Sequence, residues 1–176
     1  MVSCEIIFLG NSITDGCEWA ELFQNPNIKN RGIGGDDTDG VLERLDEIIS
    51  SKPSKIFIMI GTNDMAYGKT VDYVVSNYTK IIDSIEIICP DTKIYIQSVL
   101  PVDDAIHYTR STSDIMQINT HLEKLSAEKS IEYIELFSIF SNDDNKLNPD
   151  YSLDGLHLNG KGYQVWKEAI QKYVEE

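Results

Sequence analysis

Short apolar runs alternate with segments of helical spacing along the whole chain. The strong runs lie at residues 6–9, 56–60, 94–101 and 131–136, and a weaker one lies at residues 28–33. The first two strong runs are closed by Gly10 and Gly61, and the third ends at Pro101. Continuous β-branched runs that are closed by turn residues are typical of strands covered on both faces, as in a parallel sheet. We therefore expect four strands, with a weaker fifth, in one sheet.

Amphipathic helices are expected between these runs. Residues 41–49 carry apolar side chains at a 3.6-residue spacing, and Thr38 ahead of them is the expected N-cap. Further helices are expected at residues 71–88, 113–128 and 160–174. This alternation predicts one three-layer α/β domain over residues 1–176, with its functional site where strands end and helices begin.

Charge narrows the classes of partner. The 176 residues include 15 Lys and Arg against 29 Asp and Glu, a formal net charge of −14. This balance argues against sequence-independent binding of nucleic acid or anionic lipid, because binding either of them requires clustered Lys and Arg side chains. No run of about 18 apolar residues is present, so no membrane span is expected. Glu5 interrupts the early apolar stretch, so the sequence as it stands predicts a cytoplasmic protein, although an exported chain whose leader had been removed would look the same.

Four short segments carry candidate chemistry, and the first two follow predicted strands. In GNSIT, residues 10–14, Ser12 stands on a tight turn near helix amides that can point outward. The alternative is a serine that caps a helix. In GIGGDDT, residues 32–38, three glycines in four residues let the backbone approach a ligand and expose N–H donors. The alternative here is an ordinary loop, and the spacing is not that of a dinucleotide-binding motif.

The other two segments supply an amide and an acid–base pair. In GTND, residues 61–64, the Asn63 side chain can donate a hydrogen bond into a site or simply close a turn. In DGLH, residues 154–157, Asp154 stands three residues ahead of His157. The carboxylate can bond one ring nitrogen and fix the tautomer, which leaves the other nitrogen to take a proton from a nucleophile. Taken singly, this spacing could also arise by chance.

Together the four segments supply the parts that acyl transfer needs: a hydroxyl nucleophile, a base, an orienting acid and donors for an oxyanion. With these blocks in this order, the sequence closely resembles the SGNH (GDSL-type) hydrolase family from Gly10 to Gly162. The resemblance implies a flavodoxin-like α/β/α sandwich with a five-stranded parallel sheet. It also implies a serine esterase that acts on a small-molecule ester without a cofactor.

The resemblance assigns a role to each matching residue. Ser12 matches the nucleophile, His157 the general base, and Asp154 the acid that orients the base. The backbone N–H groups of Ser12 and Gly35, with the side-chain amide of Asn63, match the oxyanion hole.

One position departs from the family pattern. The first block usually reads Gly-Asp-Ser, whereas Asn11 precedes the serine here. Many similar members carry Asn, so activity is expected. The charge that an aspartate would bring to the site is absent, which bears on the pH optimum.

The substrate class is predicted from size and from two blocks. The chain is near the short end for this family and has no obvious lid, which is more similar to acetylesterases than to triglyceride lipases. NRGIGGDDT and DGLHLNGKGY look like the subgroup that contains sialate and other carbohydrate O-acetylesterases and platelet-activating-factor acetylhydrolase-like proteins. We therefore expect short-chain acetyl esters as substrates, with lysophospholipase or thioesterase activity as the alternative within the family.

Candidate pocket residues lie on the loops that follow the strands. They are Met65, Tyr67, Leu100 and Leu156. Core packing or plain loop filling is the alternative for each. The sequence does not choose among oligomeric states.

Two other classes fit less well. Residues 11–16 loosely resemble the phosphate loop of a flavodoxin, but an FMN-binding module leaves Asn63 and the acid–base pair unexplained. Metal catalysis is not expected, because the three histidines show no ligand spacing, and two of them, His107 and His121, are expected at the surface.

Overall fold

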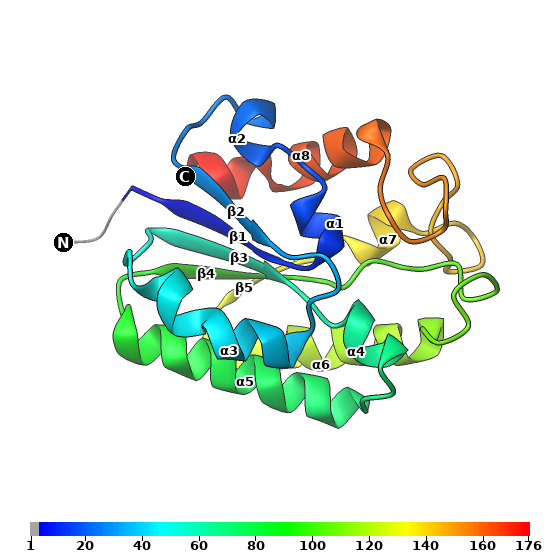
Figure 1. The fold of residues 1–176 in the computed structure, drawn as a ribbon, viewed down its shortest axis with the longest axis horizontal. Helices are drawn as coiled ribbons and strands as arrows, with labels where there is room; N and C mark the ends of the chain where they lie inside the picture. The colour runs from blue at the N-terminus through cyan, green and yellow to red at the C-terminus, as the bar shows by residue number, and fades with distance from the viewer. Residues whose placement is uncertain (1–3) are drawn as a thin grey trace.

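The computed structural model describes residues 4–176 and has three layers, with a sheet between two layers of helices (Figure 1). The sheet has five parallel strands in the order β2-β1-β3-β4-β5. The strands are β1 (Ile6–Gly10), β2 (Ile28–Gly32), β3 (Lys55–Met59), β4 (Lys93–Gln97) and β5 (Glu132–Ile134). The expected flavodoxin-like α/β/α sandwich with five parallel strands is thus confirmed.

Helices cover both faces of the sheet (Figure 1). One face carries α1 (Ser12–Asp15), α2 (Trp19–Leu22) and α8 (Gly160–Glu175). The other carries α3 (Thr38–Ile49), α4 (Thr62–Ala66), α5 (Val71–Ile88) and α6 (Thr112–Lys129), and the short α7 (Phe137–Phe140) follows β5. None of these helices is long and apolar enough to cross a bilayer, as far as residues 4–176 are concerned.

The long helices lie where periodicity places them, with one difference in capping. The N-cap of α3 is Asp37, whose side chain accepts hydrogen bonds from the N–H groups of Asp39 and Gly40. Thr38 was the expected cap, but it is the first helical residue, because its hydroxyl and N–H both bond to Asp64 instead. The short helices α1, α2, α4 and α7 were not predicted, since a single turn is too short to show a period.

A stack of aromatic rings ties the central strands together. The rings of Phe8 and Phe57 lie 5.0 Å apart, and those of Phe57 and Tyr95 lie 4.5 Å apart. The three residues are paired neighbours on β1, β3 and β4. Offset aromatic pairs add to the free energy of burying their surface, so these strands form a rigid base for the loops at their ends.

β4 is shorter than its apolar run, which predicted a strand as far as Pro101. The strand ends at Gln97 because Asn119 of α6 takes over the backbone of the next residues. The Asn119 side-chain oxygen accepts from the N–H of Val99 at 2.8 Å, and its amide donates to the Val99 carbonyl at 2.9 Å. A loop of residues 98–111, the β4–α6 loop, therefore begins directly after Gln97, at the carboxyl end of β4.

The strand order reverses between β1 and β3, and this topology positions the site. In doubly wound sheets, ligands bind in the crevice outside the carboxyl ends of the strands at such a switch point. The connections from these strands lead to α1 and α4, which lie on opposite faces at the same end of the sheet (Figure 1). Ser12 begins α1 and Asn63 lies in the first turn of α4, so the two flank the switch point.

Candidate active site

The turn that carries Ser12 is fixed from both ends. Asn11 is 2% exposed, and its side-chain oxygen accepts a hydrogen bond from the Ile13 N–H at 3.0 Å, which caps α1. The Tyr163 hydroxyl on α8 donates to the Ile13 carbonyl at 2.7 Å. Because Ser12 is the first residue of α1, its own N–H has no partner within the helix. The neutral Asn11 thus performs the capping that an aspartate would, and it leaves the Ser12 N–H available to a substrate oxygen.

Ser12, His157 and Asp154 form a continuous chain of hydrogen bonds. Ser12 Oγ lies 3.0 Å from His157 Nε2, and Asp154 Oδ2 lies 2.7 Å from His157 Nδ1. A carboxylate at Nδ1 favours the tautomer that carries its proton there, so the lone pair of Nε2 faces the serine hydroxyl. The side chains of His157 and Asp154 are about half exposed, so a substrate can reach the serine from solvent. This arrangement can activate a hydroxyl nucleophile.

The hydrogen bonds that Asp154 accepts keep its carboxylate ionised. Burial acts to raise the pKa of Asp154, but hydrogen bonds from the His157 ring and from the His157 and Leu156 N–H groups outweigh it. The net result is a pKa well below the usual range of an aspartate. Asp154 therefore remains a hydrogen-bond acceptor through the neutral and mildly acidic range, which is what an orienting group for histidine must be.

The glycine loop, residues 34–36, is held in one conformation by three side chains. Gly35 has φ +80°, a backbone region that favours glycine. The Tyr67 hydroxyl donates to the Gly35 carbonyl at 3.0 Å, and the Asn63 amide donates to the Asp36 carbonyl at 2.8 Å. Arg44 forms an ion pair with the Asp36 carboxylate at 2.7 Å. The Gly35 N–H is therefore held in a fixed direction before any ligand arrives, which is the condition for electrostatic preorganisation.

Asn63 is buried, and both ends of its amide are engaged. Its Nδ2 donates to the Asp36 carbonyl, and its Oδ1 accepts a hydrogen bond from Arg110 Nη2 at 3.0 Å. Because one neighbour is an acceptor and the other a donor, the amide has only one favourable orientation. An amide nitrogen carries two hydrogens, so the second can serve a substrate oxygen.

Asp64 connects α4 to the beginning of α3. It is fully buried and accepts hydrogen bonds from the Thr38 N–H at 3.1 Å and the Thr38 hydroxyl at 2.6 Å. Lys69 lies 3.5 Å from the same carboxylate and also pairs with Asp37. Burial raises the pKa of Asp64 in spite of the hydrogen bonds from Thr38 and the charge of Lys69. One polar network thus links the end of the GIGGDDT block to the end of the GTND block, and it fixes Asn63 relative to the glycine loop.

The β4–α6 loop contacts both halves of the site, and the sequence did not predict this. The Asp103 N–H donates to the Gly155 carbonyl at 2.8 Å, and His107 Nε2 lies 2.8 Å from the Asp154 carbonyl. Arg110, near the end of the same loop, donates a hydrogen bond to the side-chain oxygen of Asn63. His107 lies on this loop and is partly exposed, and its contact with the Asp154 carbonyl was not predicted. No motif marks these residues, and their only signal is a position after a strand at the carboxyl edge of the sheet.

The four candidate pocket residues divide into two groups. Met65, Leu100 and Leu156 are buried, with Leu100 only 1% exposed, which favours the alternative of core packing. Tyr67 is 60% exposed, and it borders the glycine loop through its hydroxyl. Tyr67 therefore remains the candidate that a substrate can contact.

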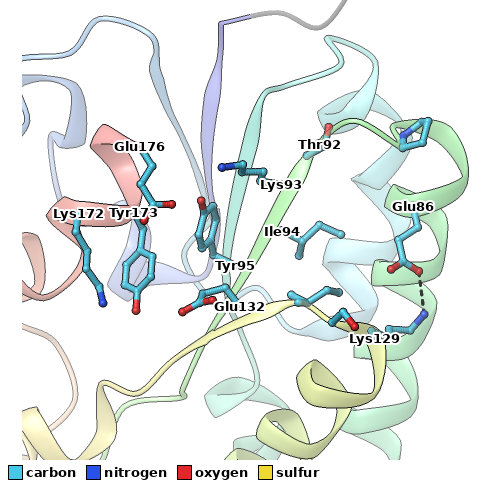
Figure 2. A pocket seen from close by; sticks show the side chains of 13 residues that line it. Glu86, Thr92, Lys93, Ile94, Tyr95, Lys129, Glu132, Lys172, Tyr173 and Glu176 are labelled. Atoms are coloured by element: carbon cyan, nitrogen blue, oxygen red, sulfur yellow. Dashed lines mark hydrogen bonds and ion pairs between the residues drawn. The ribbon is translucent and has the colours of Figure 1, made fainter.

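Outside the Ser12 site, the described residues form a large hollow but no cluster of three or more His, Cys, Asp or Glu that could hold a metal ion. The hollow has a volume of about 500 Å³ and lies at the amino ends of β4 and β5 (Figure 2). Ser12 and Asn63, by contrast, follow the carboxyl ends of β1 and β3. Its charged lining consists of Lys93, Lys129, Lys172, Glu86, Glu132 and Glu176. These charges balance, and Lys129 is paired with Glu86 at 2.9 Å, so the hollow presents no net charge to a ligand.

Known proteins resemble the chain over nearly its whole length. It is 29% identical over 184 residues to platelet-activating factor acetylhydrolase IB subunit alpha2 of Gallus gallus. This alignment covers 98% of this chain and 78% of the relative. The structure of a GDSL-like lipase from Bacteroides thetaiotaomicron is similar with a TM-score of 0.87 at 26% identity, covering 98% of this chain and 88% of that one. A structure from Streptococcus pneumonia, assigned as a platelet activating factor, has a TM-score of 0.90 at 32% identity and covers 99% of this chain and 85% of that one.

The assignment to a family rests on a match that spans most of the chain. The pattern of the GDSL-like lipase/acylhydrolase family matches residues 8–165, which include all four candidate segments. This match favours an esterase over the FMN-binding alternative. The chain therefore belongs to the GDSL-like lipase/acylhydrolase family of hydrolytic esterases.

Proposed function

We propose that the protein hydrolyses short-chain esters, with acetyl esters as its substrates, through an acyl-serine intermediate on Ser12. The observation that carries the proposal is the hydrogen-bonded chain from Asp154 through His157 to Ser12. His157 Nε2 takes the hydroxyl proton as Ser12 Oγ attacks the ester carbonyl carbon. The tetrahedral intermediate then collapses, the bond to the alcohol oxygen breaks, and His157 returns the proton to the departing alcohol.

The second half of the reaction uses the same groups. A water molecule gives a proton to His157 Nε2 as its oxygen attacks the acyl-serine carbonyl carbon. Collapse of this intermediate releases the carboxylic acid, and the proton returns to Ser12 Oγ. Asp154 stays ionised throughout and stabilises the positively charged imidazolium that forms in each half.

Three donors are proposed to hold the negative oxygen in both intermediates. They are the N–H groups of Ser12 and Gly35 and the side-chain amide of Asn63. Support comes from the fixed conformation of the glycine loop and from the single favourable orientation of the Asn63 amide. Donors that are already oriented need no reorganisation when the charge develops, and this is the main source of their effect on rate.

Changing Asn63 to alanine tests the oxyanion role. We expect kcat for p-nitrophenyl acetate to fall by about 10²- to 10³-fold, because one donor to the oxyanion is lost. Asn27→Ala is the matched control, since Asn27 is exposed in the turn before β2. Circular dichroism should show the same fold in all three proteins. A wild-type kcat in the Asn63 variant would remove this residue from the oxyanion hole.

The preference for acetyl esters rests on two supports. Relatives over most of the chain carry the name acetylhydrolase. In addition, the apolar residues that could deepen a pocket beside Ser12, such as Met65 and Leu100, are already packed in the core. The apolar surface left for the acyl group is therefore small, and a small surface suits an acetyl group better than a long acyl chain.

A lysophospholipase or thioesterase activity is the second candidate, and one observation favours it. Tyr108 and Leu153 are 87% and 94% exposed, and Ile106 is exposed beside Gly155. These apolar side chains lie on the two segments that approach each other next to the acid and base. An acyl chain could lie along them outside any pocket.

A series of p-nitrophenyl esters from acetate to palmitate separates the two candidates. We expect kcat/KM to be highest for acetate and to fall at least about tenfold by octanoate, because longer chains gain no buried contact. Each ester is also measured with Ser12→Ala to subtract hydrolysis that does not depend on the serine. A kcat/KM that rises with chain length would overturn the acetyl preference, and lysophosphatidylcholine and acyl-CoA thioesters would be the next substrates.

A further inference from the structure

Arg110 is a cation without a countercharge in the part of the chain that the structure describes. It lies at the end of the β4–α6 loop, is partly buried, and takes part in no ion pair among residues 4–176. Its Nε is buried and has no hydrogen-bond partner among these residues. Its Nη2 makes one directed contact, to Oδ1 of Asn63 at 3.0 Å.

Such a position is unfavourable for a guanidinium unless it serves another group. Moving a charge out of water without an opposite charge costs free energy, and burial lowers the pKa of Arg110 accordingly. The chain has a net charge of −14, so carboxylates are abundant, yet none of the described ones pairs with this residue. The oxygen end of the Asn63 amide is the group that the guanidinium faces instead.

The contact determines where the amide hydrogens of Asn63 point. With Arg110 donating to Oδ1, Nδ2 must lie on the side of the Asp36 carbonyl and the glycine loop. The reverse orientation would place the amide NH₂ against the guanidinium and the amide oxygen against a carbonyl, so both contacts would become repulsive. A charged donor on the oxygen also polarises the amide, which strengthens the hydrogen bonds that its nitrogen donates.

We infer that Arg110 is a positioning residue for ester hydrolysis: it orients and polarises the Asn63 amide toward the oxyanion, and it acts through Asn63 rather than on the substrate. This inference rests on the proposed role of Asn63 as an oxyanion donor. Because the oxyanion exists only in the transition state and the intermediates, loss of Arg110 should reduce kcat and leave KM nearly unchanged.

A double-mutant cycle tests the inference, with Asn63→Ala, Arg110→Gln and the combined variant assayed on p-nitrophenyl acetate. We expect Arg110→Gln to lower kcat about 10- to 100-fold in the wild-type background and less than about twofold in the Asn63→Ala background. Arg110→Lys should retain part of the lost activity, because an ammonium can still donate to Oδ1 but without the planar fork. If Arg110→Gln does not fold, as judged by circular dichroism, the lysine variant is used in the cycle.

Lys124→Gln is the matched control, since it removes one positive charge from an exposed position on α6, and it should keep wild-type kcat. The inference is overturned by wild-type kcat in the Arg110 variants or by a loss that appears only in KM. An equal loss of kcat in the two Asn63 backgrounds also overturns it, because Arg110 would then act on the substrate itself. If Asn63→Ala alone leaves kcat unchanged, the proposed oxyanion role fails as well, so the two failures are distinguishable.

Discussion

Replacing Ser12 with alanine is expected to lower kcat for p-nitrophenyl acetate by about 10⁶-fold. The hydroxyl is the proposed attacking group, and among residues 4–176 its one hydrogen bond is to His157 Nε2. Removal of the hydroxyl leaves the cap of α1 and the contact of Tyr163 with the turn in place. The variant should therefore fold normally while it loses the covalent route.

A labelling experiment makes the Ser12 result specific. A fluorophosphonate reagent should modify the wild-type protein at one serine and should not modify the alanine variant, as read by intact-protein mass spectrometry. Ser113→Ala, at an exposed position in α6, is the control and should be labelled like the wild type. Labelling of the Ser12 variant, or retention of more than about a hundredth of the wild-type kcat, would mean that another residue is the nucleophile.

Asp154→Asn is expected to lower kcat by about 10⁴-fold while the structure is preserved. The asparagine oxygen can still accept from the N–H groups of His157 and Leu156, as Asp154 Oδ1 does now. Its NH₂ would then face His157 Nδ1, which favours the tautomer with the proton on Nε2. In that tautomer the ring has no lone pair toward Ser12, so the hydroxyl loses its base.

The same variant has a signature in stability as a function of pH. Because the folded protein lowers the pKa of Asp154, its carboxylate stabilises the fold at pH values above its unfolded pKa of about 3.9. This stabilisation is lost as the pH falls below that value toward the folded pKa. The thermal midpoint of Asp154→Asn should thus lie below that of the wild type at pH 7, and the gap should narrow at pH 3.

Asp150→Asn provides the control for both measurements. Asp150 is exposed in the same connection ahead of α8 and pairs with Lys161 at the surface. Its replacement should leave kcat near the wild-type value, because no catalytic group touches it. A comparable loss of kcat in the two variants would show that charge in this segment, rather than the contact with His157 Nδ1, accounts for the result.

The sheet and the long helices were predictable because their signals are periodic and local. The expected helix at residues 71–88 has the observed bounds of α5, and each apolar run overlaps a strand. The exact end of β4 was not predictable, because it depends on Asn119, whose side chain comes from a helix some twenty residues later. Apolar composition alone cannot reveal that a distant amide has replaced the ladder hydrogen bonds.

The candidate site was predictable only where a motif marks it. The four segments lie at the carboxyl edge of the sheet, and the structure brings Ser12, Asp154 and His157 within hydrogen-bond distance of one another. Their catalytic roles stay predictions until the variants above are measured. His107 and Arg110 were missed because the β4–α6 loop has no repeated spacing, and its contacts are set by tertiary structure.

Ser12 and His157 are 145 residues apart in the sequence, so nearly the whole chain must fold before they can meet. All five strands are complete by Ile134, so a nascent or proteolysed chain could assemble the sheet and still lack its base. On the proposed roles of Ser12 and His157, turnover begins only when the segment ahead of α8 has docked against α1, where Ser12 lies 3.0 Å from His157. Esterase activity would therefore show whether the C-terminal segment has docked, whereas circular dichroism would already detect the sheet and helices of a partly folded chain.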